Sequence, residues 1–147
     1  MHVTGACHCG AITFEAEVVE GRVFACHCTD CQVIASAPFR VGAIVRRETF
    51  SMHGPFKEYS KIGTTGQRRQ QVFCPECATG IYSYSPDSAA PYLSLRLGGV
   101  HQRAQLRPAH QLWHRSALPW LSQLNDIPAC EQQEILAFVL ASTQPGQ

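Results

Sequence analysis

The chain has 147 residues, enough for one domain with a sizeable core, and its 45% hydrophobic and 9% aromatic content argues against a disordered chain. The formal net charge of +1 and the low charged fraction of 16% predict no long-range attraction to nucleic acid or to a membrane surface. No apolar run approaches the roughly 18 residues of a membrane span, and residues 1–10 do not read as a signal peptide. We therefore expect a cytoplasmic protein, in which eight cysteines favour metal binding over disulfide bonds.

Alternating and short apolar segments predict strands along most of the chain. Between Ala11 and Val18, for example, every second residue is apolar, which is typical of a half-buried strand. The expected strands are residues 11–18, 23–25, 39–45, 71–73, 81–84 and 92–97. Glycine and proline turns separate them, so the pattern predicts a mainly β fold with antiparallel strands, and 71–73 pairs with 81–84 as the arms of a hairpin.

Only the end of the chain has a helical pattern. Ile135, Leu136, Val139 and Leu140 recur at helical spacing, and Pro128 is suited to the first turn of a helix after Asp126. A short C-terminal helix is therefore expected.

Seven of the eight cysteines fall in three short clusters. These clusters are Cys7-His8-Cys9, Cys26-His27-Cys28-Thr29-Asp30-Cys31 and Cys74-Pro75-Glu76-Cys77. A two-residue spacer lets a tight turn aim both sulfurs at one point, and alternate residues of a strand also share a face. Cys7, Cys9, Cys74 and Cys77 would thus complete a tetrahedral structural zinc site. The alternative is that these cysteines are merely buried and free.

The middle cluster offers an odd number of ligands. Cys26, Cys28 and Cys31 supply three thiolates, and catalytic zinc sites typically keep three protein ligands with the fourth position open. Two alternatives remain at this point: a fourth ligand from elsewhere, such as a histidine, or no metal at all.

Other side chains carry weaker signals. His27 is a candidate proton shuttle or simply a structural histidine, and His110 with His114 is a candidate ligand face or an ordinary pair. Arg68 or Arg69 is suited to grip a substrate carboxylate, although such basic pairs are usually just solvated. Cys130, which stands alone, is expected in the core.

The ordered set of motifs resembles the glutathione-dependent formaldehyde-activating enzyme (GFA) family, also called the centromere-protein-V family. The resemblance rests on Gly5-x-Cys7-x-Cys9-Gly10-x-Ile12-x-Phe14, Cys26-His27-Cys28-x-x-Cys31 and Phe73-Cys74-x-x-Cys77, and on the later Gly99, Pro108, His110, Trp113 and Trp120. It covers about residues 3–121. We therefore expect residues 1–125 to form the zinc-binding domain, with residues 126–147 as a C-terminal helix and tail packed on it or frayed from it.

The resemblance implies a β-tent of antiparallel sheets joined by a structural zinc, whose ligands would be Cys7, Cys9, Cys74 and Cys77. It implies a second, catalytic zinc at Cys26, Cys28 and Cys31. Three ligands bind more weakly than four, so partial occupancy of this second zinc is expected.

The sequence departs from the family pattern at three places. Gln32-Val33 replaces the usual basic residues, while Ser36 and Ala78 stand where glycine is usual. Loss of the cations near the second zinc disfavours a polyanionic thiol such as glutathione.

The expected function is that of a zinc-dependent carbon–sulfur lyase. Its substrates would be aldehyde–thiol adducts like S-hydroxymethylglutathione, with the thiol bound at the open Cys26, Cys28 and Cys31 zinc site. Its partner would be a small thiol or such an adduct, with no nucleic acid and no membrane involved. The alternative is a non-catalytic, zinc-stabilised module that binds a partner protein.

Overall fold

The computed structural model describes residues 1–63 and 65–132. Within them the strands are β1 (His2–Ala6), β2 (Thr13–Cys26), β3 (Arg40–Arg46), β4 (Ser51–His53), β5 (Lys57–Ile62), β6 (Arg68–Phe73), β7 (Gly80–Tyr84), β8 (Tyr92–Arg96) and β9 (His110–Leu112). The helices are α1 (Thr29–Ala35) and the 3₁₀ helices η1 (Arg47–Thr49), η2 (Arg103–Gln105), η3 (His114–Ser116) and η4 (Pro119–Asp126).

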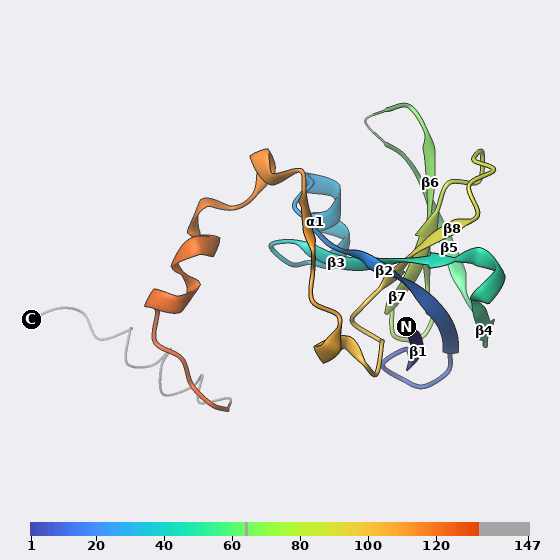
Figure 1. Ribbon diagram of the computed structural model, residues 1–147, viewed down its shortest axis with the longest axis horizontal. Helices are drawn as coiled ribbons and strands as arrows, with labels where there is room; N and C mark the ends of the chain where they lie inside the picture. Colours follow the sequence, from blue (N-terminus) through green and yellow to red (C-terminus); the bar gives the residue numbers. More distant parts are fainter. Residues whose placement is uncertain (64, 133–147) are drawn as a thin grey trace, which may run out of the picture.

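The strands form an open, mostly antiparallel sheet in the order β1-β2-β3-β8-β7-β6-β5 (Figure 1). Strand β2 belongs to two parts of this arrangement. Its first half pairs with β1 and β4, and its second half pairs with β3 and β9. Its pairing with β3 shifts register between Val18 and Val23, near the left-handed Gly21. This irregularity allows one strand to serve two sheet segments that face each other across the core.

The core lies between these two sheet segments. On β2, Phe14, Ala16 and Val18 point into it, as do Ala43 and Val45 of β3. Leu93 and Leu95 of β8 complete the same layer. Side chains one position away along each strand therefore point to the opposite face of the sheet. That outer face carries the candidate site.

Most of the strands expected from the sequence are present. The 11–18 and 23–25 segments belong to one long strand, β2, rather than two, and the expected hairpin is the antiparallel pair β6 and β7. The mainly antiparallel β prediction is confirmed. The pattern gave no sign of α1, whose first residues, Thr29 to Cys31, belong to the middle cysteine cluster.

After η3 the chain runs away from the sheets (Figure 1). The end of η4 at Asp126 is followed by irregular chain that includes Pro128. The expected C-terminal helix, with Ile135, Leu136, Val139 and Leu140, lies outside the described residues. No helix in the described part of the chain has the length and apolar character needed to cross a bilayer.

Candidate metal centre

The structure brings the first and third cysteine clusters together into one four-cysteine cluster. The two pairs of cysteines are 65 residues or more apart in the sequence. Cys7 and Cys9 follow the end of β1, while Cys74 and Cys77 form the turn between β6 and β7. The sulfur of Cys9 lies 3.5 Å from that of Cys7 and 3.7 Å from that of Cys74. All four sulfurs lie within 4.8 Å of one another. The arrangement joins the start of the chain to a distant hairpin, as the spacing predicted.

Local hydrogen bonds hold this cluster in place. The backbone N–H of Ile12 donates to Cys7 Sγ at 3.2 Å, and the N–H of His8 donates to Thr79 Oγ1 at 3.1 Å. The hydroxyl of Thr79 lies 3.1 Å from Cys77 Sγ and, by donating to it, lowers the pKa of Cys77 to about 5. Donors directed at the sulfurs favour thiolates, which are the form that binds metal.

The four-cysteine cluster has the geometry of a zinc site. In a tetrahedron with Zn–S bonds of about 2.3 Å, neighbouring sulfurs are about 3.8 Å apart. The 3.5 and 3.7 Å separations are close to this edge length. The donor set, four sulfurs of which Cys7 and Cys74 are buried, is also the usual set of a closed structural site. The four-cysteine cluster could therefore hold zinc.

The turn that carries Cys74 and Cys77 requires an unusual backbone conformation. Ala78, immediately after it, has φ 59°, and its N–H donates to the carbonyl of Cys74 at 3.0 Å. Ser36, which ends α1, is also left-handed, with φ 46°. These are two of the positions where the sequence departs from the pattern that it resembles, in which glycine is expected. A left-handed backbone is strained for residues with a Cβ, which gives a structural reason for expecting glycine there.

The second cluster lies on the outer face of the sheet. Cys26 ends β2, Cys28 is the N-cap of α1, and Cys31 is in the first turn of that helix. Cys31 Sγ is 2.6 Å from Cys28 Sγ and 3.3 Å from Cys26 Sγ. The N–H of Cys31 donates to Cys28 Sγ at 3.2 Å. The tight turn from β2 into α1 is therefore what gathers the three sulfurs.

The thiols of the second cluster differ in acidity because of their mutual contacts. The hydrogen bond from Cys31 lowers the pKa of Cys26 to about 5, and the same contact raises the pKa of Cys31. A low-pKa thiolate beside two further sulfurs is a donor set that suits zinc. The sulfurs stand closer together than the edge of a zinc tetrahedron, so that metal binding requires them to spread slightly.

The second cluster keeps three ligands. All three sulfurs lie within 4.8 Å of one another, and no fourth His, Cys, Asp or Glu joins the group in residues 1–63 and 65–132. In particular, neither His27 nor His114 joins it. Of the alternatives left open by the sequence, a histidine as fourth ligand is therefore not supported, and the residues present fit a three-thiolate zinc site.

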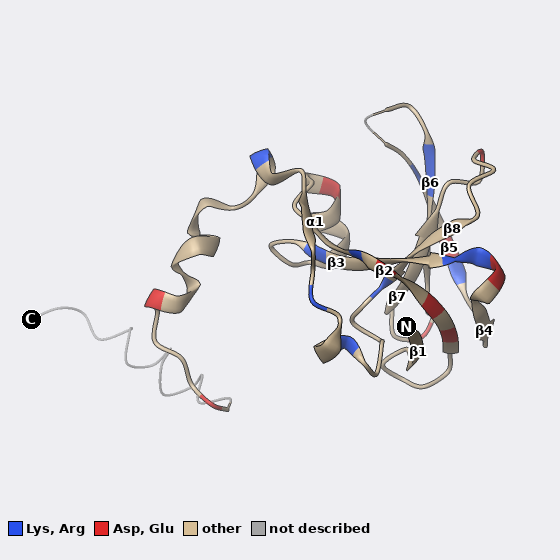
Figure 2. Cartoon of the chain, in the orientation of Figure 1, with Lys and Arg blue, Asp and Glu red and all other residues tan. Residues whose placement is uncertain are grey.

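A cavity of about 530 Å³ opens around this cluster. Its lining includes the basic side chains Arg40, Lys61, Arg69 and Arg115. The tip of the β5–β6 hairpin forms one wall, and an ion pair between Lys61 of β5 and Asp30 of α1 fastens this wall to the helix. Figure 2 shows basic positions on both β3 and β6. Basic side chains from several elements therefore line the cavity. In α1 itself, Gln32 and Val33 stand where the resemblance predicts basic residues.

The floor of the cavity is a hydrogen-bonded guanidinium network. Gln71 Oε1 accepts from Arg96 at 2.6 Å and from Arg40 at 3.3 Å. Arg96 is buried, and burial together with the nearby charge of Arg40 lowers the pKa of Arg96 to about 9. The Nε of Arg40 is buried and has no hydrogen-bond partner within the described structure. Because Asp30, the one carboxylate in the lining, already pairs with Lys61, this concentration of positive charge suits an anion.

The histidines flagged by the sequence lie elsewhere. His27 is buried on the other side of β2, where its Nε2 lies 2.9 Å from Gln111 Oε1 and its ring contacts Phe39 and His114. It lines a different cavity, of about 420 Å³, and does not line the cavity of the cysteine cluster. A proton-shuttle role for His27 is therefore not supported. His110 and His114 are exposed and, like His27, belong to no metal-ligand group of the described residues.

Two further expectations resolve differently. Arg69 lines the cavity, whereas Arg68 points away and pairs with Asp87, so the structure separates the two arginines that the sequence treated together. Cys130 is exposed rather than in the core, which corrects that expectation. Cys130 follows η4, in the part of the chain that leaves the sheets, and this placement explains its exposure.

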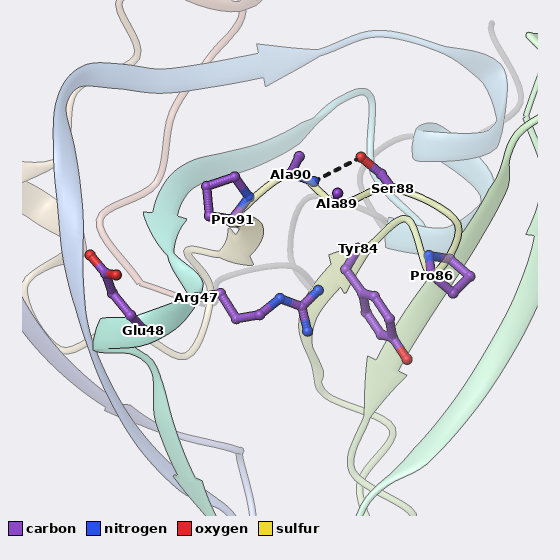
Figure 3. A pocket seen from close by; sticks show the side chains of 8 residues that line it. All are labelled: Arg47, Glu48, Tyr84, Pro86, Ser88, Ala89, Ala90 and Pro91. Atoms are coloured by element: carbon purple, nitrogen blue, oxygen red, sulfur yellow. Dashed lines mark hydrogen bonds between the residues drawn. The ribbon is translucent and has the colours of Figure 1, made fainter.

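Another concave surface, of about 560 Å³, lies between η1 and the loop before β8 (Figure 3). Its lining is Arg47, Glu48, Tyr84, Pro86, Ser88, Ala89, Ala90 and Pro91. The guanidinium of Arg47 lies 5.1 Å from the centre of the Tyr84 ring, an ordinary cation–π contact. This surface contains no thiol or histidine, so the chemistry of the protein is better sought at the cysteine clusters.

Comparisons with known proteins agree with this organisation. A family model described as glutathione-dependent formaldehyde-activating enzyme matches residues 2–116. A protein of Schizosaccharomyces pombe described as an uncharacterized lyase is 26% identical over 88 residues, which cover 60% of this chain and 61% of that protein. The crystal structure of a Rhodobacter sphaeroides protein superposes with a TM-score of 0.55 at 20% identity, covering 74% of this chain and 98% of that one. This last likeness shows the fold alone.

We predict that Cys74→Ser removes one zinc and most of the folded protein. Structural zinc contributes on the order of 10 kcal/mol in small zinc-binding peptides, which is comparable to the whole stability of a domain. Metal analysis and thermal unfolding would measure both effects. The matched control is Cys130→Ser, which removes an exposed cysteine outside both clusters and should change neither. An unchanged melting curve and zinc content in Cys74→Ser would contradict the prediction.

The second cluster should behave independently. Cys28→Ser is expected to lower the metal content by at most one zinc and to leave the fold intact, because Cys26 to Cys31 closes only a local loop. Circular dichroism and metal analysis on the purified variant would decide. Collapse of the whole fold would mean that the two ligand sets are wrongly divided.

Ala78→Gly should stabilise the protein. The left-handed conformation costs a residue with a Cβ about 1–2 kcal/mol, of which glycine's greater chain entropy offsets only part. We expect a gain of about 0.5–1 kcal/mol in urea unfolding of the zinc-loaded protein. Ala89→Gly, at an exposed position without positive φ, is the control and should be neutral or slightly destabilising. A less stable Ala78→Gly variant would refute this explanation.

Proposed function

Because the chain belongs to the glutathione-dependent formaldehyde-activating enzyme family, we propose that it is a zinc-dependent carbon–sulfur lyase acting on aldehyde–thiol adducts. The observation that carries the proposal is the three-cysteine cluster at the base of a basic cavity. The likeness to a fission-yeast protein described as a lyase supports the reaction class, although the alignment spans less than two thirds of that protein.

Cys26, Cys28 and Cys31 would hold the catalytic zinc. A zinc ion there would supply an open fourth position for the sulfur of a small thiol and would keep that sulfur deprotonated near neutral pH. The four-cysteine cluster would hold the structural zinc and, having all its ligands, would take no part in the reaction.

The basic lining would bind the rest of the thiol. Arg40 and Arg69 both line the cavity, and a guanidinium group suits the geometry of a carboxylate. Burial lowers the pKa of Arg69, which is further lowered by the charge of Arg40. An anion placed between these groups would relieve their repulsion. A carboxylated thiol such as glutathione is therefore a suitable substrate, despite the absence of basic residues at Gln32 and Val33.

The hairpin wall would orient the adduct and limit access of water. The ion pair between Lys61 and Asp30 connects the β5–β6 hairpin to α1 over the cluster. Thr29, Ser94 and Ser116 also line the cavity. These groups can hold the adduct's hydroxyl, whose proton must leave when the aldehyde forms.

Cobalt substitution tests this proposal directly. Adding glutathione or another carboxylated thiol should change the visible spectrum of the cobalt protein, and Cys28→Ser should abolish that change. A carboxylated thiol should reach half-saturation at a concentration roughly tenfold lower than that of uncharged 2-mercaptoethanol, because a charge-assisted contact contributes about 1.5–3 kcal/mol.

The same experiment separates the two candidate functions. Cleavage of an aldehyde–thiol adduct by the wild-type protein, with loss of cleavage in Cys28→Ser, would support the lyase. If no thiol in the panel perturbs the cobalt spectrum and no adduct is cleaved or formed, the non-catalytic partner-binding module becomes the better interpretation.

A further inference from the structure

A second hollow of about 410 Å³ continues from the cavity of the three-cysteine cluster. The two spaces adjoin, because both are lined by Phe24, Arg69, Ser94 and Leu112. The lining of the hollow is completed by Arg22, Ile44 and His110. We call this hollow the side groove.

Strand geometry places the side groove directly beside the cluster. Phe24 and Cys26 are two residues apart on β2 and so project from the same face, about 7 Å from each other. On β9, Leu112 lies in register with Cys26 and His110 lies in register with Phe24. A group attached near the sulfurs therefore needs to extend by only one strand step to enter the groove.

The accessible surface of the side groove is mostly apolar, although Arg22, Arg69, Ser94 and His110 also line it. Gly42 lies in register with Phe24 on the neighbouring strand, and a Cβ at Gly42 would stand 2.9 Å from the Phe24 ring, so glycine is what lets the ring lie flat there. Ile44 continues the apolar surface along β3, and Leu112 remains 42% exposed beside it. Apolar side chains left accessible in a concave surface next to reactive groups are typical of a ligand site.

The cavity and the side groove thus offer contrasting surroundings that meet at the cysteine cluster. An adduct of an aldehyde and a thiol, R–CH(OH)–S–R′, also has two arms that meet at its reacting atoms. The arm R′ of a carboxylated thiol matches the basic wall of Arg40, Lys61 and Arg115. The other arm, the substituent R of the aldehyde, would then lie in the side groove.

We propose that the side groove of Phe24, Ile44 and Leu112 binds the apolar substituent of the aldehyde, so that the substrates are adducts of alkyl or aryl aldehydes. This inference rests on the proposed lyase function. In the reaction the C–S bond breaks with its electron pair going to sulfur, the hydroxyl proton is released, and the carbon becomes the carbonyl of R–CHO. Formaldehyde carries only hydrogen at the position of R and would leave the groove empty.

The first test measures binding without chemistry. S-methylglutathione and S-hexylglutathione have the same carboxylates, and because they lack the adduct's hydroxyl they cannot be cleaved to an aldehyde. Calorimetric titration of the zinc-loaded full chain should show S-hexylglutathione binding roughly tenfold or more tightly, since each buried methylene adds about 0.8 kcal/mol. Equal affinities, or no binding of either thioether, would overturn the inference.

Variants localise the effect to the groove. Ile44→Thr keeps a β-branched residue in β3 but makes the groove polar, and should lower the hexyl-to-methyl affinity ratio about threefold or more. If Ile44→Thr folds poorly, Leu112→Asn is the second variant, at an exposed position of the short strand β9, and it should also lower the hexyl-to-methyl affinity ratio. Ile127→Thr is the matched control, because Ile127 is exposed and lines neither space. A ratio that falls equally in the control would refute the assignment.

A comparison of adduct cleavage separates this inference from the proposed function. With glutathione as the thiol, the kcat/KM for the hexanal adduct should exceed that for the formaldehyde adduct roughly tenfold or more. Cleavage of both adducts at equal efficiency would overturn the inference and leave the lyase function standing. Preferential binding of S-hexylglutathione without cleavage of any adduct would support the side groove and overturn the lyase function.

Discussion

The approach of Cys7 and Cys9 to Cys74 and Cys77 is the contact on which the rest of the structure depends. It holds the segment after β1 against the turn between β6 and β7, together with the hydrogen bond from the N–H of His8 to Thr79 Oγ1. β1 stands at one end of the strand order, and β6 and β7 stand toward the other, so that the contact connects distant strands. Cys7 and Cys74 also belong to the buried core between them. A domain of this size buries a limited apolar area. A metal site that connects distant segments therefore contributes a large part of its stability.

The candidate site follows from the strict alternation of side chains in the sheet. Val23 and Ala25 of β2 project from one face of the strand, and Phe24 and Cys26 project from the other. The register then places the partners of these two residues on the same side, across β9 and β3. The three-cysteine cluster, the basic cavity and the side groove are therefore adjacent because neighbouring strands present their outer residues together. The helix α1, the hairpin tip and the segment from Trp113 to Ser116 contribute the lining residues that lie outside the sheet.

Positive charge at the site comes from residues outside α1. The resemblance suggested that substituting Gln32 and Val33 for basic residues would remove the cation beside the second cluster, yet Arg40, Arg69 and Arg115 reach the same cavity from β3, β6 and η3. Electrostatic interactions depend on distance and burial, and these side chains lie close together in a partly enclosed space. Binding of an anionic thiol can thus be supported by residues that no local motif identifies.

The sequence alone determined the features that rest on local chemistry and periodicity: the antiparallel strands, the hairpin around Cys74 and Cys77, and the grouping of seven cysteines into a set of four and a set of three. Spacing is sufficient for these, because turns and strands act over a few residues. The tertiary structure alone decided that Arg69 and not Arg68 faces the cavity, that His27 is buried on the opposite side of β2, and that an apolar groove adjoins Cys26. Each of these depends on pairing register between strands far apart in the chain, and a shift of one residue in register would turn every such side chain to the other face.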